Sequence, residues 1–391
     1  GESLIEDAAT VKWLEQLLRR GGRAMNDLQR LQAQRPPSAT MLTNNRGTAP
    51  GLHARLADTD IFCLPGPPLE MHAMFERDVA PRLRPPPGHV VAARVLHTLG
   101  LPEAEIGMRL GELMHRGRNP SVGTTASGGV VSCRLRYDGD ASQSQRILDE
   151  LEQQVRAACD PYIFGAGDET IYSAVVGELI RRHEALVTVE SCTGGLLGSM
   201  ITSVPGSSAA YLGGFVTYSN DFKSSAVNVD PALIEQHGAV SKEVAEAMAV
   251  GGLIRAGLSS NETLETIRRT NASMRTTSSS SKDFTAAHSV AITGIAGPDG
   301  GTETKPVGTV FIAVASSSPQ TANRKSHTAS RRFRFPGDRD AVRDRAAKLA
   351  LAMLRFHVRG IPIDRLLWQI NDDGSSPSIP SRASKSEKAP G

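Results

Sequence analysis

The feature that most restricts the fold of this sequence is an apolar segment, residues 185–189, that runs directly into a glycine turn. The turn reads Glu190-Ser191-Cys192-Thr193-Gly194-Gly195, and an apolar helical pattern starts at Leu196. A buried strand, a tight turn and a helix start in this order are typical of α/β sheets. The same order places small polar side chains beside the free N–H groups of a helix N-terminus.

Strand and helix patterns alternate through the whole C-terminal half of the chain. We expect buried strands at 185–189, 289–292 and 307–315, and helices at 171–180, 242–254 and 340–356. Ser241 is placed as the N-cap of the second helix. The pattern predicts an α/β domain over residues 166–368.

Two further regions precede this domain. The proline-rich run Arg84-Pro85-Pro86-Pro87-Gly88 cannot lie inside a helix and separates residues 1–84 from the next block. In that block, residues 130–137 alternate as a half-buried strand and 142–159 have helical spacing, which predicts a small α+β module at 85–165. The fold class is therefore multidomain α/β.

Two segments have the composition of unfolded chain. Residues 261–283 are rich in Ser and Thr, and we predict a surface insertion at about 258–286. From about residue 369 the chain consists mainly of Gly, Ser, Pro and Lys, which predicts a disordered tail over 369–391.

Composition restricts partners and location. With 44 Lys and Arg against 41 Asp and Glu, and only 4% aromatic residues, the chain lacks the charge and stacking surface of a nucleic-acid binder. No apolar run approaches the roughly 20 residues of a membrane helix, and the first residues have no signal pattern. Four scattered cysteines fit neither a metal site nor a disulfide framework. We expect a cytoplasmic homo-oligomer with no membrane partner.

The glycine turn holds two candidate nucleophiles side by side, Ser191 and Cys192, and the local sequence does not choose between them. Backbone N–H groups around Thr193 and Gly194 could hold an anion or a developing oxyanion. The alternative interpretation is a turn that only packs a helix closely against a sheet.

A serine nucleophile needs a base, and the segment 214–223 offers one. His183 and His237 lack convincing partners in the sequence, whereas Tyr218 and Lys223 lie within one strand end and turn. A lysine kept neutral by burial can accept the serine proton, and a tyrosine hydroxyl can relay it. The alternative is an exposed lysine beside a half-buried tyrosine.

Two later clusters could bind a ligand. A strand opens into the glycine loop 293–301, whose backbone can approach a ligand closely, although Lys305 is not followed by the Ser or Thr of a Walker A loop. Arg339 and Arg343 share one face at a helix start and could grip a phosphate. The alternative for the glycine loop is a plain hairpin connection. The alternative for the two arginines is a solvated or ion-paired helix face.

These clusters, in this order, resemble the C-terminal domain of the CinA family (competence/damage-inducible protein A), the nicotinamide-nucleotide amidohydrolases. The segments that carry the resemblance extend from about Thr170 to Phe356 and are 190–195, 204–208, 218–220, Lys223, 238–241, 293–298 and 305–309. The resemblance implies an α/β fold that hydrolyses nicotinamide mononucleotide to nicotinate mononucleotide and ammonia, with no metal or cofactor for that step.

The resemblance also implies roles for particular residues. Ser191 is similar to the family's nucleophile, which selects it over Cys192, and Lys223 and Tyr218 are similar to its base and proton relay. The residues expected to bind substrate are Glu190, Thr193, Gly194, Gly195, Asn220, Thr293, Gly294, Ala296, Gly297, Arg339 and Arg343.

The front of the chain resembles the same family. Segments 45–51 and 64–71 are similar to the later part of its molybdopterin-binding-like domain, and 118–121 to its middle module. In full-length members the front domain is linked to a metal-dependent ADP-ribose pyrophosphatase activity. The family's opening half is absent here, so we expect that activity, and its divalent metal site, to be incomplete. A non-enzymatic competence or DNA-repair accessory role is the other alternative, and the near-neutral charge argues against it.

Overall fold

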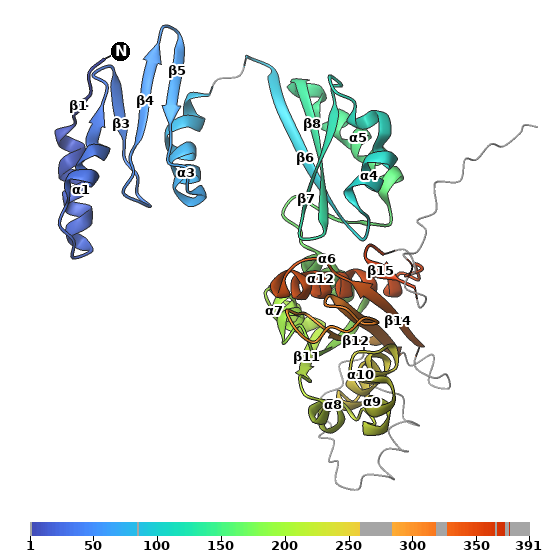
Figure 1. Cartoon of the computed structure of the whole chain (residues 1–391). Coiled ribbons are helices and arrows are strands. Elements are labelled where there is room, and N and C mark those ends of the chain that lie inside the picture. The colour runs from blue at the N-terminus through green and yellow to red at the C-terminus, as the bar shows by residue number, and fades with distance from the viewer. Residues whose placement is uncertain are drawn as a thin grey trace, which may run out of the picture. The chain divides into compact units, whose positions relative to one another are not determined.

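The computed structural model describes residues 2–83, 86–258, 284–317, 327–363, 366–371 and 375 (Figure 1). The chain divides into two compact units, Gly1–His89 and Val90–Gly391. Most of the insertion predicted at about 258–286 and of the tail predicted at 369–391 lies outside the described residues.

The first unit contains a two-stranded and a three-stranded antiparallel sheet, with orders β1-β2 and β3-β4-β5. Its strands are β1 (Ile5–Glu6), β2 (Gln34–Arg35), β3 (Ala39–Leu42), β4 (Gly51–Leu56) and β5 (Thr59–Cys63). Its helices are α1 (Ala8–Arg20), α2 (Asp27–Arg30), α3 (Pro68–Met74) and the short η1 (Leu31–Ala33), η2 (Phe75–Val79) and η3 (Ala80–Arg82).

The second unit begins with a small α+β module whose four-stranded sheet has the order β7-β8-β6-β9. The strand predicted at 130–137 and the helix predicted at 142–159 are both present, since apolar residues at helical spacing cover the sheet. The elements are β6 (His89–Leu99), α4 (Glu103–Leu110), η4 (Gly111–Met114), β7 (Ser121–Ser127), β8 (Val130–Asp140), η5 (Ala141–Gln143), α5 (Ser144–Cys159) and β9 (Ile163–Ala166).

A six-stranded sheet of order β11-β10-β12-β13-β14-β15 forms the rest of the unit. Its strands are β10 (Glu184–Glu190), β11 (Tyr211–Val216), β12 (Ala286–Gly294), β13 (Thr309–Ser317), β14 (His327–Arg334) and β15 (Gln369–Ile370). Its helices are α6 (Ile171–Arg182), α7 (Leu196–Thr202), η6 (Ser207–Ala209), α8 (Asn220–Val227), α9 (Pro231–His237), α10 (Lys242–Arg255) and α12 (Arg339–Val358). The fold class predicted from the sequence, multidomain α/β, is confirmed.

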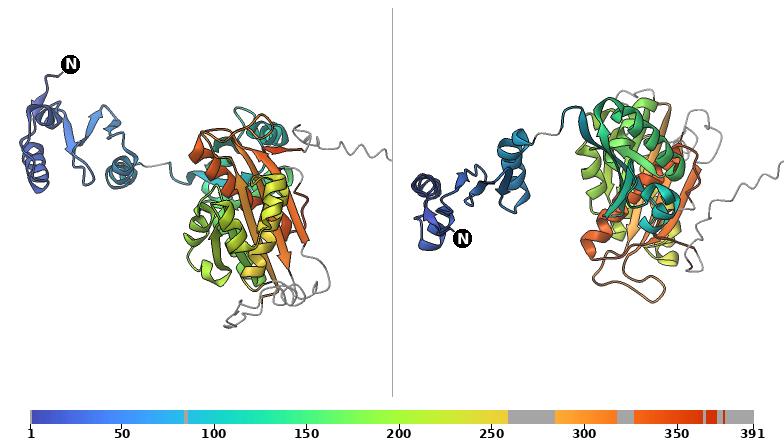
Figure 2. Two further views of the ribbon diagram at one scale, coloured as in Figure 1. Left: turned by 60° about the horizontal axis from the view of Figure 1, so that its bottom comes forward. Right: turned by 90° about the horizontal axis from the view of Figure 1, so that it is seen from above.

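Helices cover both faces of the six-stranded sheet. Figures 1 and 2 show α12 and α10 on opposite faces. In β10, β12 and β13, even-numbered residues such as Ile292 pack toward α6, α7 and α12, and odd-numbered ones such as Ala291 pack toward α8, α9 and α10. Strand β10 is buried along its whole length and runs parallel to both neighbours, β11 and β12. Ligands of such sheets bind beyond the carboxyl ends of the parallel strands, where Ser191 follows β10.

The strands and helices predicted in this domain are present with ends shifted by a few residues, and Ser241 caps α10 through a bond from the Val244 N–H. Two boundaries differ. Lys223, placed in a turn by the sequence analysis, lies in helix α8, because Ser219 accepts the Phe222 N–H and starts the helix early. Gln369 is buried and forms a strand with Phe333, so the predicted tail does not begin at residue 369.

Among the described helices, none is both long enough and apolar enough to cross a membrane.

Candidate active site

The carboxyl end of β10 brings Ser191 next to Lys223 on α8. The Lys223 Nζ lies 3.3 Å from the Ser191 Oγ, although the two residues are 32 positions apart in the chain. Ser191 is 8% exposed and Lys223 only 2% exposed. The sheet and the helix that follows β11 therefore assemble a buried serine–lysine pair.

Burial sets the protonation of this lysine. Loss of water around the ammonium lowers the pKa of Lys223, and the neighbouring Cys192 opposes this only in part. A lowered pKa favours the neutral amine, which can accept a proton from Ser191. The alternative interpretation is an exposed lysine beside a half-buried tyrosine. The structure shows the opposite, since Lys223 is buried and Tyr218 is 62% exposed.

Cys192 has the opposite character. Its side chain is buried, and burial above all raises the pKa of the thiol to about 12. Because the thiolate is the nucleophilic form of cysteine, a thiol with this pKa is unreactive near neutral pH. The local chemistry thus favours Ser191 over Cys192, a choice that the local sequence left open.

The glycine turn after Ser191 presents backbone donors. Gly194 and Gly195 have φ of +60° and +92°, which other residues rarely adopt. The Gly194 N–H donates to the Ser191 carbonyl at 3.0 Å and closes the turn. Within the described residues, the N–H groups of Cys192 and Thr193 donate to no other group of the chain. The donors available for an oxyanion are therefore those of Cys192 and Thr193, and the predicted Gly194 donor is occupied.

Glu190 is buried and acts on helix α7. Its carboxylate accepts the N–H groups of Gly195, Leu197 and Gly198 at 3.1, 3.0 and 2.8 Å. These are the free donors of a helix N-terminus, where a negative charge is stabilising. Glu190 is therefore the cap of α7, and its carboxylate occupies the N–H of Gly195 as well; its contact with substrate stays a prediction.

The first turn of α12 reaches the site through two arginines. Arg339 donates to the Gly297 carbonyl at 2.8 Å and to the Tyr218 hydroxyl at 2.9 Å. Arg343 donates to the Thr193 carbonyl at 3.0 Å and pairs with Asp340. Both predicted phosphate ligands therefore also brace the site, Arg339 through the tyrosine and Arg343 through the glycine turn.

The remaining predicted residues make no hydrogen bond to Ser191 or Lys223 among the described contacts. Thr293 is buried and donates its hydroxyl to the Ala239 carbonyl at 2.8 Å. Gly294 is packed so tightly that an added Cβ would lie 2.7 Å from Val310. Ala296 is buried, and Asn220 is exposed at the start of α8.

Two threonine hydroxyls lie next to the nucleophile. The sequence predicts Thr193 as a substrate-binding residue but gives its hydroxyl no role, and it does not single out Thr217. The Oγ1 atoms of Thr193 and Thr217 are buried and have no hydrogen-bond partner among the described residues. Thr217 lies beside Ser191 because its N–H donates to the Glu190 carbonyl at 2.8 Å. Buried hydroxyls in native proteins normally have partners, so a polar ligand or water is expected here. A threonine at a strand end is too common for the sequence alone to single out Thr217.

Comparison with known proteins gives the same family over both parts of the second unit. The family model of the CinA C-terminal domain matches residues 168–261 and 265–358, and that of the damage-inducible protein CinA KH domain matches 93–165. A protein of Caldicellulosiruptor saccharolyticus, named as competence-damage inducible, is 35% identical over 91% of this chain and 78% of its own length.

A similarly named protein of Symbiobacterium thermophilum is 38% identical over 92% of this chain and 79% of its own length. A crystal structure of a CinA superfamily protein from Escherichia coli has 31% identity and a TM-score of 0.36, covering 47% of this chain and 87% of that one.

Proposed function

Because the chain belongs to the CinA family and carries a buried Ser191–Lys223 pair, we propose that it is a serine amidohydrolase that converts nicotinamide mononucleotide to nicotinate mononucleotide and ammonia. The observation that carries the proposal is the 3.3 Å contact between the Lys223 Nζ and the Ser191 Oγ. A nucleophile within reach of a base is the minimal arrangement for covalent acyl transfer.

The proposed reaction begins with the transfer of the Ser191 proton to neutral Lys223 as the Oγ attacks the carboxamide carbon. The Lys223 ammonium then returns the proton to the departing amide nitrogen, the C–N bond breaks, and ammonia leaves an acyl-enzyme. Water attacks the acyl carbon and Lys223 takes its proton. The bond between the acyl carbon and the Ser191 Oγ then breaks, Lys223 returns the proton to that oxygen, and the acid leaves.

The tetrahedral intermediates of both steps carry a negative oxygen. The N–H groups of Cys192 and Thr193 are free within the described chain and adjacent to the nucleophile, and we propose them as the oxyanion donors. Loss of one such donor typically raises the barrier by about 3 kcal/mol. The Arg343 bond to the Thr193 carbonyl keeps this turn in place.

Tyr218 and the α12 arginines complete the proposal. The Tyr218 hydroxyl accepts from Arg339 and so can still donate its own proton, as a relay to the leaving group requires. Arg339 and Arg343 stand at the N-terminus of a 20-residue helix, where an anion is stabilised by the helix dipole. We assign the substrate phosphate to this end of α12.

The test is ammonia release from nicotinamide mononucleotide, measured in the presence of a chelator for the full chain and for two neighbouring variants. Ser191→Ala is expected to lose at least about 1000-fold in kcat, because it removes the nucleophile. Cys192→Ala is the matched control and is expected to stay within about tenfold of the parent chain, since a thiol with a raised pKa takes no part in the reaction.

The reverse result, an active Ser191→Ala and an inactive Cys192→Ala, would transfer the nucleophile to the cysteine. A folded parent chain that releases no ammonia would contradict the amidase itself.

A further inference from the structure

A second hydrogen-bonded cluster lies at the opposite end of the six-stranded sheet from Ser191. It joins Glu184 at the start of β10, His288 near the start of β12 and Ser316 near the end of β13. Ser191 lies seven positions after Glu184 along β10, which corresponds to about 20 Å. The cluster therefore takes no part in the amidase site.

The three side chains form a continuous relay. The Ser316 Oγ lies 2.6 Å from the His288 Nδ1, and the His288 Nε2 lies 3.1 Å from a Glu184 carboxylate oxygen. Strand pairing explains the first contact, because Ser316 and His288 are directly opposite each other on β13 and β12. The other Glu184 oxygen accepts from the Arg182 Nε at 2.9 Å.

The carboxylate determines which imidazole nitrogen carries the proton. Burial would raise the pKa of Glu184, but its bonds from His288 and Arg182 outweigh burial and lower it, so the group is ionised. An ionised carboxylate only accepts, so the His288 Nε2 carries the proton of this contact. The Nδ1 is then an acceptor that points at the Ser316 hydroxyl, as a general base requires.

A third contact and the burial of the group fit the same role. The His357 Nε2 lies 2.8 Å from the Ser316 Oγ and can donate to it while the Ser316 proton points at His288. Glu184 and His288 are 7% and 5% exposed, whereas Ser316 is only half-buried and can meet a reagent. Nowhere in the described chain do His, Cys, Asp and Glu gather in a group that could hold a metal ion, so the cluster is not a metal site.

We propose that Ser316, His288 and Glu184 form a second nucleophilic site, independent of Ser191, that takes an acyl group from activated carboxylic esters. The Ser316 Oγ bonds to the ester carbonyl carbon as its proton moves to His288. The C–O bond to the alcohol breaks, and the alcohol leaves with that proton. Water then attacks the acyl carbon and gives a proton to His288. The bond between the acyl carbon and the Ser316 Oγ breaks, His288 returns the proton to that oxygen, and the acid leaves.

The experiment uses the full chain carrying Ser191→Ala, which removes the amidase nucleophile from the measurement. A fluorophosphonate probe is added, the labelled peptide is mapped by mass spectrometry, and 4-nitrophenyl acetate hydrolysis is measured in parallel. We expect the label on Ser316, and at least a tenfold slower hydrolysis when Ser316→Ala is added. Adding His288→Gln is expected to slow labelling at least about 100-fold, by loss of the base.

Ser317→Ala in the same background is the matched control, because this neighbour points to the other face of β13 and lies outside the relay; it is expected to keep both labelling and hydrolysis. Circular dichroism verifies that each variant is folded. If His288→Gln fails to fold, Glu184→Gln is the substitute, with slower labelling expected. A folded Ser191→Ala chain without label on Ser316, or with hydrolysis unchanged by Ser316→Ala, would overturn the proposal. Neither result bears on the ammonia-release test.

Discussion

Burial and function oppose each other at Lys223. The side chain is 2% exposed, and its one hydrogen bond to a described group joins it to the neutral hydroxyl of Ser191. A buried ammonium without an opposite charge is costly, which is why the pKa of Lys223 is lowered. The same cost makes the amine available as a base. The burial that makes Lys223 a base in the proposed reaction therefore also lowers the stability of the fold.

Lys223→Met is therefore expected to abolish ammonia release and to make the protein more stable near neutral pH. The unfolded-state pKa is close to 10.5 and the folded-state pKa is lower, so the penalty is fully present below the folded value. It shrinks as the pH rises toward 10.5, and the stability difference between variant and parent should shrink with it. Urea unfolding measured across this pH range gives the free energies.

Lys242→Met is the control, because Lys242 is exposed at the start of α10 and should show no such pH dependence. For the proposed reaction of the parent chain, kcat/KM should rise with pH as Lys223 loses its proton. A Lys223→Met variant less stable than the parent at every pH would contradict the assignment of a penalised buried lysine.

At the scale of elements, the site depends on how closely α10 packs against its neighbours. An added Cβ at Gly251 would lie 1.8 Å from the Val227 carbonyl at the end of α8, and one at Gly252 would meet Val189 and Ser289 of the sheet at 2.6 Å. Two consecutive glycines thus let one helix approach both a sheet and the helix that carries Lys223. Glu190 acts at the same scale, since it holds the start of α7.

Gly251→Ala is expected to displace α8, because the contact is with backbone and cannot be relieved by a side-chain rotation. The displacement lengthens the path between Lys223 and Ser191, so kcat should fall at least about tenfold, since a shift of 1 Å can cost 100-fold. The measurement is steady-state ammonia release combined with thermal unfolding.

Gly107→Ala is the matched control in helix α4, where nothing lies within 4 Å of an added Cβ. It is expected to gain about 0.5–1 kcal/mol of stability and to leave kcat unchanged. Equal activities of the two alanine variants would show that the close contact at Gly251 does not position α8.

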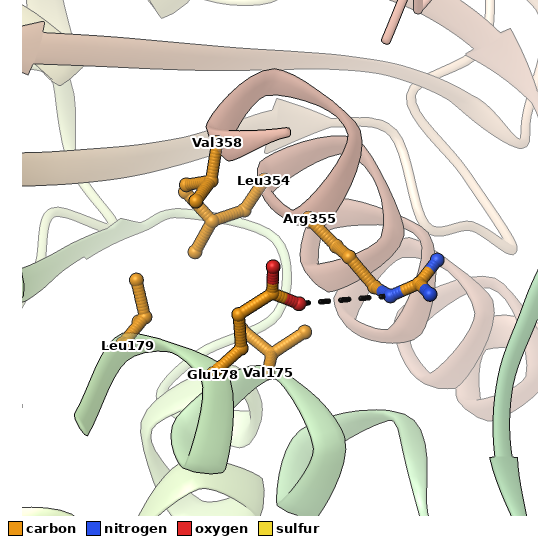
Figure 3. Close-up of a pocket in the computed structure, with 6 residues that line it drawn as sticks. All are labelled: Val175, Glu178, Leu179, Leu354, Arg355 and Val358. Carbon is orange, nitrogen blue, oxygen red and sulfur yellow. Dashed lines mark ion pairs between the residues drawn. The ribbon is translucent and has the colours of Figure 1, made fainter. Parts of the chain in front are cut away.

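Across the whole second unit, α12 connects the proposed active site to the small α+β module. Its first turn carries Arg339 and Arg343, and near its other end Arg355 donates to the carbonyls of Pro161 and Ile163 at 2.9 Å each. Figure 3 shows Arg355 facing Glu178 of α6, with 3.9 Å between the charged atoms, in a pocket otherwise lined by aliphatic side chains. Burial lowers the pKa of Arg355 to about 10, so it remains charged at neutral pH.

Arg355→Met is expected to cost about 3–5 kcal/mol, because it leaves two carbonyls and a buried carboxylate with fewer donors. The same change should raise hydrogen exchange around residues 161–163, where the module meets α12. Arg359→Met removes a more exposed partner of Glu178 and should cost only about 0–1 kcal/mol. Urea unfolding of both variants gives their free energies of unfolding. Equal losses of stability would argue against the role of Arg355 in joining the α+β module to the six-stranded domain.

Much of the architecture follows from local patterns. Apolar runs predict β10, β12 and β13, and helical spacing with capping residues predicts α6, α10 and α12, because strand and helix periods and caps are properties of neighbouring residues. Motif order carried the family resemblance and, with it, the roles suggested for Ser191 and Lys223. The cluster at Ser316 could not be predicted in this way, since Glu184 is 104 positions from His288, Ser316 is a further 28 positions on, and none of the three lies in a motif of the resemblance.

By itself, then, the sequence determined which segments form strands and helices, where the chain can turn, and which small set of residues is chemically able to react. The tertiary structure alone decided which of those residues are buried, which meet and which are occupied elsewhere. Lys223 is inside and Tyr218 outside, Glu190 caps a helix, and Cys192 holds its proton. The physical reason is that desolvation and hydrogen-bond partnership depend on what packs around a group, and those neighbours are distant in the chain.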